Sequence, residues 1–407
     1  MSKKKSTNKL PGGFSFAAAS CGIRDKGPSQ RLDLGLIVAG GPVSAAAVFT
    51  TNQVKAAPVL VSAEHLAASK GRVRAIVVNS GNANCATGAR GMADARATAA
   101  ALGRELGCEP KQILVSSTGV IGVPLPTERI IGALPKIVRD SAVDGKTFDE
   151  FSRAIMTTDT RLKQAWASCR VGGKTVRLAG CAKGAGMIHP HMATMLAFIV
   201  TDLAARPARL ARALRQAVGG TFNAITVDGD TSTNDSVYLM ASGASGAAPP
   251  ETGSADEKSF GRALEKVCRE LALEIVADGE GAGHLVQIEV RGAPSDRAAR
   301  RVAETIATSP LVKTALAGAD PNWGRFLAAA GRAGVPFDPS KVRVWLADRL
   351  VFRAGRPLPF SESDVHRRML EAKVNVAIDL GAGSGRSRMW TCDLTTEYIH
   401  INSSYRT

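Results

Sequence analysis

Residues 183–200 read Lys-Gly-Ala-Gly-Met-Ile-His-Pro-His-Met-Ala-Thr-Met-Leu-Ala-Phe-Ile-Val, a glycine-rich, positively charged turn that leads into an apolar run. Within it, Thr194 follows the small residue Ala193. If the bond between them is cut, Thr194 carries a hydroxyl nucleophile and an α-amine whose ordinary pKa is about 7.7–8.0. Such a threonine can attack a carbonyl while its own amine accepts the proton. The stretch is therefore either an ordinary strand or the site of an N-terminal nucleophile.

The composition indicates a folded protein with sizeable hydrophobic cores. Of the 407 residues, 45% are hydrophobic and 22% are charged, which excludes a chain that is disordered throughout. The net charge of +16 suggests nucleic acid or anionic substrates as partners. Part of that charge lies in the polar start of the chain, at Lys3, Lys4, Lys5 and Lys9. The rest is spread without a dense basic run, which favours small anionic molecules over nucleic acid.

The cysteines and the apolar segments bear on the cellular compartment. The seven cysteines are odd in number, widely spaced and without a Cys-x-x-Cys pair, which favours reduced thiols over a disulfide framework. The apolar segment 14–19 is too short for the core of an export signal. The longest apolar run, residues 192–200, cannot span a bilayer. We therefore expect a cytoplasmic protein.

Short apolar strands alternate with amphipathic helices along the whole chain. Strands are predicted at residues 74–78, 113–115, 175–178, 195–200, 285–290, 342–346 and 374–380. Helices are predicted at 93–106, from a cap at Thr127 with a stripe of Ile131, Leu134 and Val138, along Phe260, Leu264, Val267 and Leu271, and after a cap at Ser295. This alternation without long linkers predicts one α/β body of layered sheets and helices.

Four polar segments accompany the predicted strands and helices. The Thr118 hydroxyl and the Gly119 N–H could together hold a developing oxyanion, because glycine permits close approach. Three hydroxyls occur at 157–160, Glu280 lies between glycines, and the chain ends in the polar segment 401–407. Each segment alone is more typical of structure. Together with Lys183 and Thr194 they supply the groups needed for acyl transfer involving an amino acid.

Two patterns that resemble metal sites are better explained otherwise. His189 and His191 flank a proline, which does not place both on one helical face. Asp228-Gly229-Asp230 lacks the twelve-residue spacing of a calcium loop, so these residues are predicted to form polar turns that order a loop. No metal ion is expected.

The segment around Thr194 resembles the cleavage-site signature of the glutamate N-acetyltransferase family, also called ornithine acetyltransferases, of arginine biosynthesis. Further blocks similar to that family follow in the same order along almost the whole chain, at residues 48–58, 79–84, 278–282, 320–325 and 398–407. The sequence departs from the family pattern at His189, at His191 and at Gly283-His284.

The resemblance implies a precursor that cuts itself between Ala193 and Thr194. The products would be an α chain of residues 1–193 and a β chain of residues 194–407, assembled as an α2β2 heterotetramer. The implied fold is a layered αββα sandwich similar to that of N-terminal-nucleophile hydrolases. In the implied site Thr194 is the nucleophile, and Thr118 and Gly119 form the oxyanion hole. The implied substrate contacts are Thr157, Lys183, Thr194, Glu280, Asn402 and Thr407.

The reaction implied by the resemblance moves an acetyl group from N2-acetylornithine to glutamate through an acetyl-Thr194 intermediate. No cofactor is expected, although acetyl-CoA stays open as an alternative acetyl donor. Two rival hypotheses remain: an amidase that passes the acyl group to water, and a basic nucleic-acid-binding protein.

Overall fold

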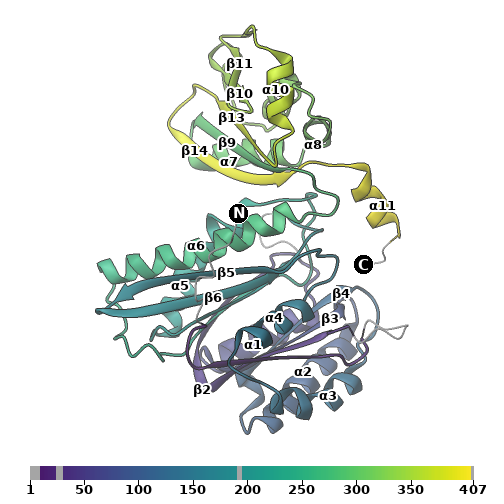
Figure 1. The fold of residues 1–407 in the computed structure, drawn as a ribbon, viewed down its shortest axis with the longest axis vertical. Helices are drawn as coiled ribbons and strands as arrows, with labels where there is room; N and C mark the ends of the chain where they lie inside the picture. The colour runs from purple at the N-terminus through teal and green to yellow at the C-terminus, as the bar shows by residue number, and fades with distance from the viewer. Residues whose placement is uncertain (1–9, 24–30, 190–194, 405–407) are drawn as a thin grey trace.

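The computed structural model describes residues 10–23, 31–189 and 195–404 of the chain, which form two bodies, each with its own β-sheet (Figure 1). Ala193, Thr194, His191 and Thr407 lie outside the described residues. The larger sheet has the order β4 (Ile113–Val120), β3 (Arg72–Asn82), β2 (Leu34–Phe49), β8 (Ser236–Ala241), β7 (Leu196–Thr201), β6 (Lys174–Lys183) and β5 (Lys163–Val171), with β1 (Phe14–Ala19) paired to β2.

The long strand β2 belongs to two layers of this sheet. Its first half pairs with β1 and β3, and residues 44–49 pair with β8. The register with β3 shifts between Val38 and Val43, where the chain passes through Gly40, Gly41 and Pro42. On one side of this shift lie β1, β3 and β4, and on the other lie β5 to β8. We call these the first and second leaf.

The two leaves fold onto each other. Tyr238 of β8 donates a hydrogen bond of 3.4 Å to the Val115 carbonyl of β4, although β2 and β3 separate these strands in the sheet order. The apolar layer between the leaves joins Phe198 and Tyr238, whose rings stack at 5.3 Å, to Ile37 and Ile76. Helix α4 (Gly145–Ala154) adds aromatic side chains to this layer.

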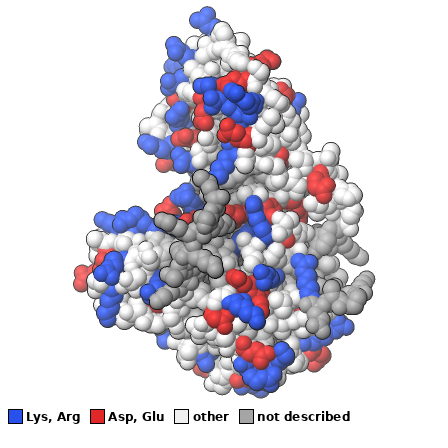
Figure 2. All heavy atoms as spheres, viewed as in Figure 1, with Lys and Arg blue, Asp and Glu red and all other residues white. Residues whose placement is uncertain are grey.

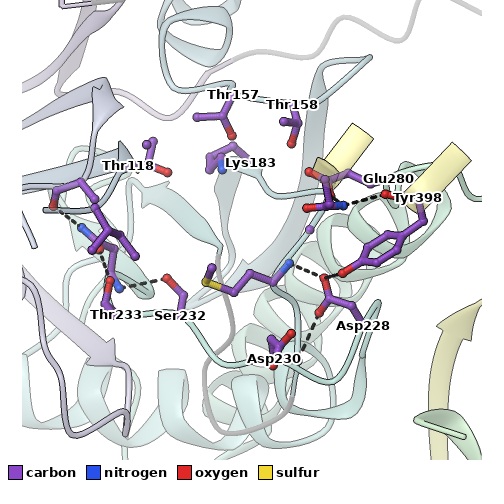
Figure 3. A pocket seen from close by; sticks show the side chains of 17 residues that line it. Thr118, Thr157, Thr158, Lys183, Asp228, Asp230, Ser232, Thr233, Glu280 and Tyr398 are labelled. Atoms are coloured by element: carbon purple, nitrogen blue, oxygen red, sulfur yellow. Dashed lines mark hydrogen bonds between the residues drawn. The ribbon is translucent and has the colours of Figure 1, made fainter. Parts of the chain in front are cut away.

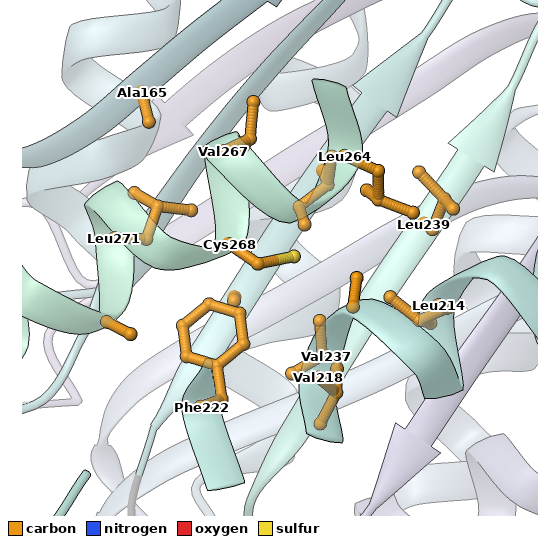
Figure 4. Close-up of a cluster of buried hydrophobic side chains, with 14 of the residues drawn as sticks. Ala165, Leu214, Val218, Phe222, Val237, Leu239, Leu264, Val267, Cys268 and Leu271 are labelled. Carbon is orange, nitrogen blue, oxygen red and sulfur yellow. The ribbon is translucent and has the colours of Figure 1, made fainter. Parts of the chain in front are cut away.

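Helices cover the outer faces of both leaves. Because side chains alternate along a strand, Leu36 and Val77 face away from the second leaf, toward α2 (Gly88–Glu105) and α3 (Thr127–Arg139). On the other side, Val237 and Leu239 pack with α5 (Pro207–Gly219) and α6 (Ala255–Ala277) (Figure 4). Helix α1 (Ala57–Ala68) packs against β4 and α2. The resulting order of helix, sheet, sheet, helix confirms the predicted αββα sandwich.

Residues 285–392 build the second body. Its sheet has the order β12 (Arg356–Pro357), β11 (Arg349–Arg353), β10 (Arg343–Leu346), β13 (Lys373–Asp379), β9 (Leu285–Ala293) and β14 (Gly385–Cys392). Helices α7 (Asp296–Ala307), α8 (Pro310–Ala317), α9 (Trp323–Gly331) and α10 (Glu362–Met369) belong to it, and its core is separate from those of the sandwich. The expectation of one layered body was therefore incomplete. The last helix, α11 (Thr396–Ser404), leads the chain back beside the sandwich (Figure 1).

The helix prediction after Thr127 was wrong in its details. Pro126 is the capping position, and the Thr127 hydroxyl donates to the Leu125 carbonyl at 3.3 Å instead of accepting a backbone N–H. The fully buried stripe is Ile130, Leu134 and Ile137. Two of the three predicted positions were therefore one residue too late, and one residue turns the helix face by about 100°. The other caps and stripes hold: Ser295 accepts the Ala298 N–H at the start of α7, and the four apolar residues predicted along α6 are buried.

No helix in the described part of the chain is long and apolar enough to cross a membrane.

Candidate active site

A cavity lies at the edge of the sandwich where β4 and β6 end and β7 and β8 begin. Figure 3 shows Thr118 and Lys183 across this cavity from Glu280 and Tyr398. Six of the predicted site residues line it: Thr118, Gly119, Thr157, Lys183, Glu280 and Asn402. They come from segments on both sides of position 194, so the fold brings together residues that are far apart in the sequence. The structure does not describe the remaining three predicted site residues, Ala193, Thr194 and Thr407.

The Thr118–Gly119 segment is held rigidly at the end of β4. Gly119 has a φ of +133°, and a Cβ atom there would lie 2.3 Å from the Gly81 carbonyl carbon of β3. Only glycine fits this close approach of two strands. The amide of Asn234 donates to the Ser117 carbonyl at 2.9 Å, and Thr118 is 4% exposed. The segment can therefore present a hydroxyl and an N–H with little freedom to move.

Lys183 lies at the end of β6, next to a buried network of charges. Asp159 accepts hydrogen bonds from the Lys163 ammonium at 2.6 Å and from the Gly184 N–H at 2.7 Å, and Lys163 also contacts Asp278. Burial alone would raise the pKa of Asp159, but the charges of Lys183 and Lys163 hold it below its usual range. The carboxylate therefore stays ionised and fixes the first residue of the glycine-rich turn.

Asp228 fixes the next part of that turn. Its carboxylate accepts the Met187 N–H at 2.5 Å and the Ile188 N–H at 2.9 Å. It also accepts the Tyr398 hydroxyl of α11 at 3.3 Å. This confirms the prediction that Asp228 orders a loop. The sequence analysis did not foresee that Asp228 and Tyr398 line the cavity, since neither belongs to a recognisable catalytic pattern.

Glu280 forms an acidic wall opposite the strand ends. Its backbone N–H donates to the Ala185 carbonyl at 2.8 Å, and its carboxylate accepts the Asn402 amide at 2.8 Å. A Cβ atom at Gly186 would lie 2.4 Å from this carboxylate, so a larger residue there would displace the Glu280 side chain from its present position. With Asp228 and Asp230 also in the lining, the cavity presents carboxylates on one side and the Lys183 ammonium on the other. Such a cavity suits a ligand that carries both charges.

The two histidines that depart from the family pattern and can be described are both paired with carboxylates. His189 lies 3.0 Å from Glu304 of α7 and 3.3 Å from the Thr226 hydroxyl, so both of its ring nitrogens have partners. His284 lies 3.0 Å from Asp393. Neither lines the cavity. The described ranges contain no group of three or more His, Cys, Asp or Glu side chains placed to hold a metal ion.

A four-layered αββα sandwich with its cavity at the strand ends defines a class of fold, with the layout expected above from the resemblance to N-terminal-nucleophile hydrolases. Comparison with known proteins narrows this class to one family. Residues 15–407 match the model of the ArgJ family, and the chain belongs to that family.

Its relatives match over nearly their full length. The chain is 47% identical to the arginine biosynthesis bifunctional protein ArgJ of Chlorobaculum tepidum over 399 residues, which cover 97% of this chain and 96% of the relative. It is 46% identical to the protein of the same name from Geobacter sulfurreducens, with coverage of 97% and 99%. A crystal structure of the Bacillus halodurans arginine biosynthesis bifunctional protein ArgJ is 40% identical, with a TM-score of 0.50. That match covers 51% of this chain and 98% of the solved chain.

We predict opposite effects for two glycine-to-alanine substitutions. Gly119→Ala is expected to lower the free energy of unfolding by about 2 kcal/mol or more, because the new Cβ meets the Gly81 backbone at a positive φ. Gly132→Ala, in α3 where nothing lies within 4 Å, is expected to be neutral or stabilising by up to about 1 kcal/mol. Thermal melting of both variants measures the difference. Equal melting temperatures would contradict the tight approach of β3 and β4.

Proposed function

We propose that this protein transfers an acetyl group from N2-acetylornithine to glutamate, with Thr194 as the nucleophile. The products are ornithine and N-acetylglutamate. The observation that carries the proposal is the gathering of Thr118, Gly119, Lys183 and Glu280 around one cavity at the sheet edge where β7 begins. Thr194 precedes that strand by two residues in the sequence. Membership of the ArgJ family supports the same reaction.

The transfer proceeds in two halves. The Thr194 amine takes the proton from the Thr194 hydroxyl, whose oxygen attacks the acetyl carbonyl and releases ornithine. The amine of glutamate then attacks the acetyl-threonine ester and leaves as N-acetylglutamate. In both halves the Thr118 hydroxyl and the Gly119 N–H stabilise the negative charge on the carbonyl oxygen. Loss of one such donor typically lowers the rate by about 10²–10³-fold.

Charge complementarity explains how an amino acid is held. Lys183 binds the substrate carboxylate, and Glu280 binds the side-chain ammonium of ornithine. Asn402 donates to Glu280 at 2.8 Å and so keeps its carboxylate turned toward the cavity. Thr157 and Thr407 complete the proposed substrate contacts. Thr157 is placed by its own N–H, which donates to Asp159 at 2.9 Å.

Self-cleavage between Ala193 and Thr194 frees the amine that this chemistry needs. The connection between β6 and β7 contains that bond, and Thr194 divides the chain near its middle. The solved Bacillus halodurans chain corresponds to about half of this chain, whereas the relatives of the same name match it over nearly their full length. These lengths support a cut that yields chains 1–193 and 194–407.

Four finer statements also belong to the proposal. The cleaved chains assemble as an α2β2 heterotetramer, which light scattering of the purified protein measures directly. The enzyme works in the cytoplasm without a cofactor. Acetyl-CoA is a second acetyl donor, in keeping with the word bifunctional in the names of the relatives.

Each of the two rival functions requires a feature that can be checked. An amidase would release free acetate from N2-acetylornithine without glutamate. A nucleic-acid-binding protein would need a continuous basic surface. On the face drawn in Figure 2, Lys and Arg side chains are interspersed with Asp and Glu and form no continuous band among the residues described there.

One prediction of the proposed function concerns cleavage. Thr194→Ala is expected to give one full-length band on a denaturing gel, because the attacking hydroxyl is absent. Thr175→Ala, at the start of β6 and away from the cavity, should give the two bands of the unaltered protein. Two bands from Thr194→Ala would refute the proposed nucleophile.

A second prediction concerns the intermediate. Mixing the cleaved protein with N2-acetylornithine should add one acetyl group to the β chain, and adding glutamate should remove it as N-acetylglutamate. Intact-mass spectrometry follows both steps. The same measurement with acetyl-CoA tests the second donor. If ornithine is released while no acetylated chain appears, transfer through Thr194 is wrong.

A further inference from the structure

The proposed self-cleavage poses a proton problem that the mature enzyme does not have. After the cut, the Thr194 amine serves as the base. Before the cut, the same nitrogen is part of the Ala193–Thr194 peptide bond and cannot accept a proton. Another group must therefore take the proton from the Thr194 hydroxyl and supply one to the departing nitrogen. This inference rests on the proposed function and concerns which residue does so.

Asp235 holds the residue that follows Thr194. Its Oδ1 accepts the Met195 N–H at 2.7 Å, and the Ser236 N–H donates to the Met195 carbonyl at 3.1 Å. The Asp235 carbonyl in turn accepts the Thr50 N–H of the adjoining loop at 3.0 Å. Met195 is thereby fixed at the start of β7. Because Met195 directly follows Thr194 in the sequence, the N–H that Asp235 holds belongs to the peptide bond next to the proposed cleavage bond.

The second oxygen of this carboxylate has no hydrogen-bond partner among the described residues. Asp235 is 0% exposed, and its Oδ2 is buried without a donor in hydrogen-bond geometry, although the Ser232 hydroxyl lies close enough to the carboxylate to lower its pKa. Buried polar atoms are nearly always paired, so an unpaired carboxylate oxygen beside a proposed reaction centre requires an explanation. Oδ1 already accepts the hydrogen bond from the Met195 N–H. Oδ2 remains available to a group that comes and goes, such as a hydroxyl proton.

The surroundings of Asp235 suit a proton carrier. Burial raises the pKa of Asp235 well above the usual value of an aspartate, and the Met195 N–H, the charge of Lys183 and the Ser232 hydroxyl counteract this shift only in part. A carboxyl group with a raised pKa is a stronger base when ionised than an ordinary aspartate, as a group that takes up and returns a proton must be. A histidine could carry the proton instead, and His189 is the described histidine nearest to Thr194 in the sequence. Both of its ring nitrogens, however, already have partners, Glu304 and Thr226.

We infer that Asp235 carries the proton during self-cleavage. Its Oδ2 takes the proton from the Thr194 hydroxyl as the oxygen bonds to the Ala193 carbonyl carbon. The carbon–nitrogen bond then breaks, and Asp235 gives the proton to the nitrogen of Thr194. The result is an ester between Ala193 and Thr194 and a free α-amine. Water hydrolyses the ester to the Ala193 carboxylate and the Thr194 hydroxyl, and Asp235 ends in its starting state.

Substitution of Asp235 in the full chain tests the inference. Asp235→Asn keeps the shape of the side chain and an oxygen for the Met195 N–H, but cannot carry a proton. Its self-cleavage is expected to slow by at least about 10²-fold, the usual contribution of general acid–base catalysis. The matched control is Asp202→Asn, a buried aspartate of the same sandwich that accepts the Arg177 N–H at 2.7 Å far from the cavity. This control should cleave at the unaltered rate.

A second variant separates proton transfer from packing. Asp235→Glu keeps the carboxyl group but adds a methylene to a buried position. If Asp235 carries a proton, the glutamate variant cleaves faster than the asparagine variant. If its role is only to fill space and hold Met195, the asparagine variant cleaves faster, and that order overturns the inference.

Hydroxylamine cleaves esters, so it shows whether the variant fails before or after the ester between Ala193 and Thr194 has formed. The Asp235→Asn chain should stay intact in hydroxylamine, because the ester does not form without the proton carrier. Rapid cleavage by hydroxylamine would show that the ester forms without Asp235 and would also overturn the inference. The outcome for Thr194→Ala distinguishes failure of the proposed function from failure of the inference about Asp235. If Thr194→Ala stays uncut while Asp235→Asn cleaves normally, the proposed function stands and the role of Asp235 fails.

Discussion

The strand β2 imposes the constraint on which the sandwich depends. One half pairs with β1 and β3 and the other half with β8, so the two leaves cannot separate without breaking a continuous strand. The shift in register near Gly40 and Gly41 lets the strand pass from one leaf to the other. This connection brings the end of β4 over the start of β8. Asn234 can therefore reach the Ser117 carbonyl at 2.9 Å and close one side of the cavity.

Three aspartates hold the chain on both sides of the proposed cleavage site. Asp159 accepts the Gly184 N–H, Asp228 accepts the N–H groups that follow Gly186, and Asp235 accepts the Met195 N–H. A carboxylate that accepts backbone N–H groups forms a stronger bond than a neutral acceptor does. The glycines let neighbouring segments pack closely, and the aspartates hold individual backbone N–H groups in place. The site thus combines a permissive backbone with well-defined anchors.

Local patterns predicted the elements better than the site contacts. The apolar spacing along α6 determines its buried face, because each of those residues interacts with the same layer. The sequence predicted that Asp228 orders a loop, but it did not predict which N–H groups Asp228 and Asp235 bind. Each binds N–H groups about forty residues earlier in the chain, and no local pattern encodes that pairing. The long motifs of a known family contain Lys183 and Glu280, and the polar segment after a predicted strand contains Thr118. All three line the cavity, although no motif describes the contacts that hold them there.

The pairing of β6 with β7 determines whether the protein can refold after it has unfolded. These strands are antiparallel neighbours, and the proposed cut falls in the connection between them. Before the cut, folding is a reaction of one chain; afterwards, the same pairing requires two separate chains to meet, so recovery depends on their concentration. The six residue pairs between these strands keep the halves together while the sheet persists. Cleavage thus converts a reversible folding equilibrium into a stability governed by the rate of unfolding.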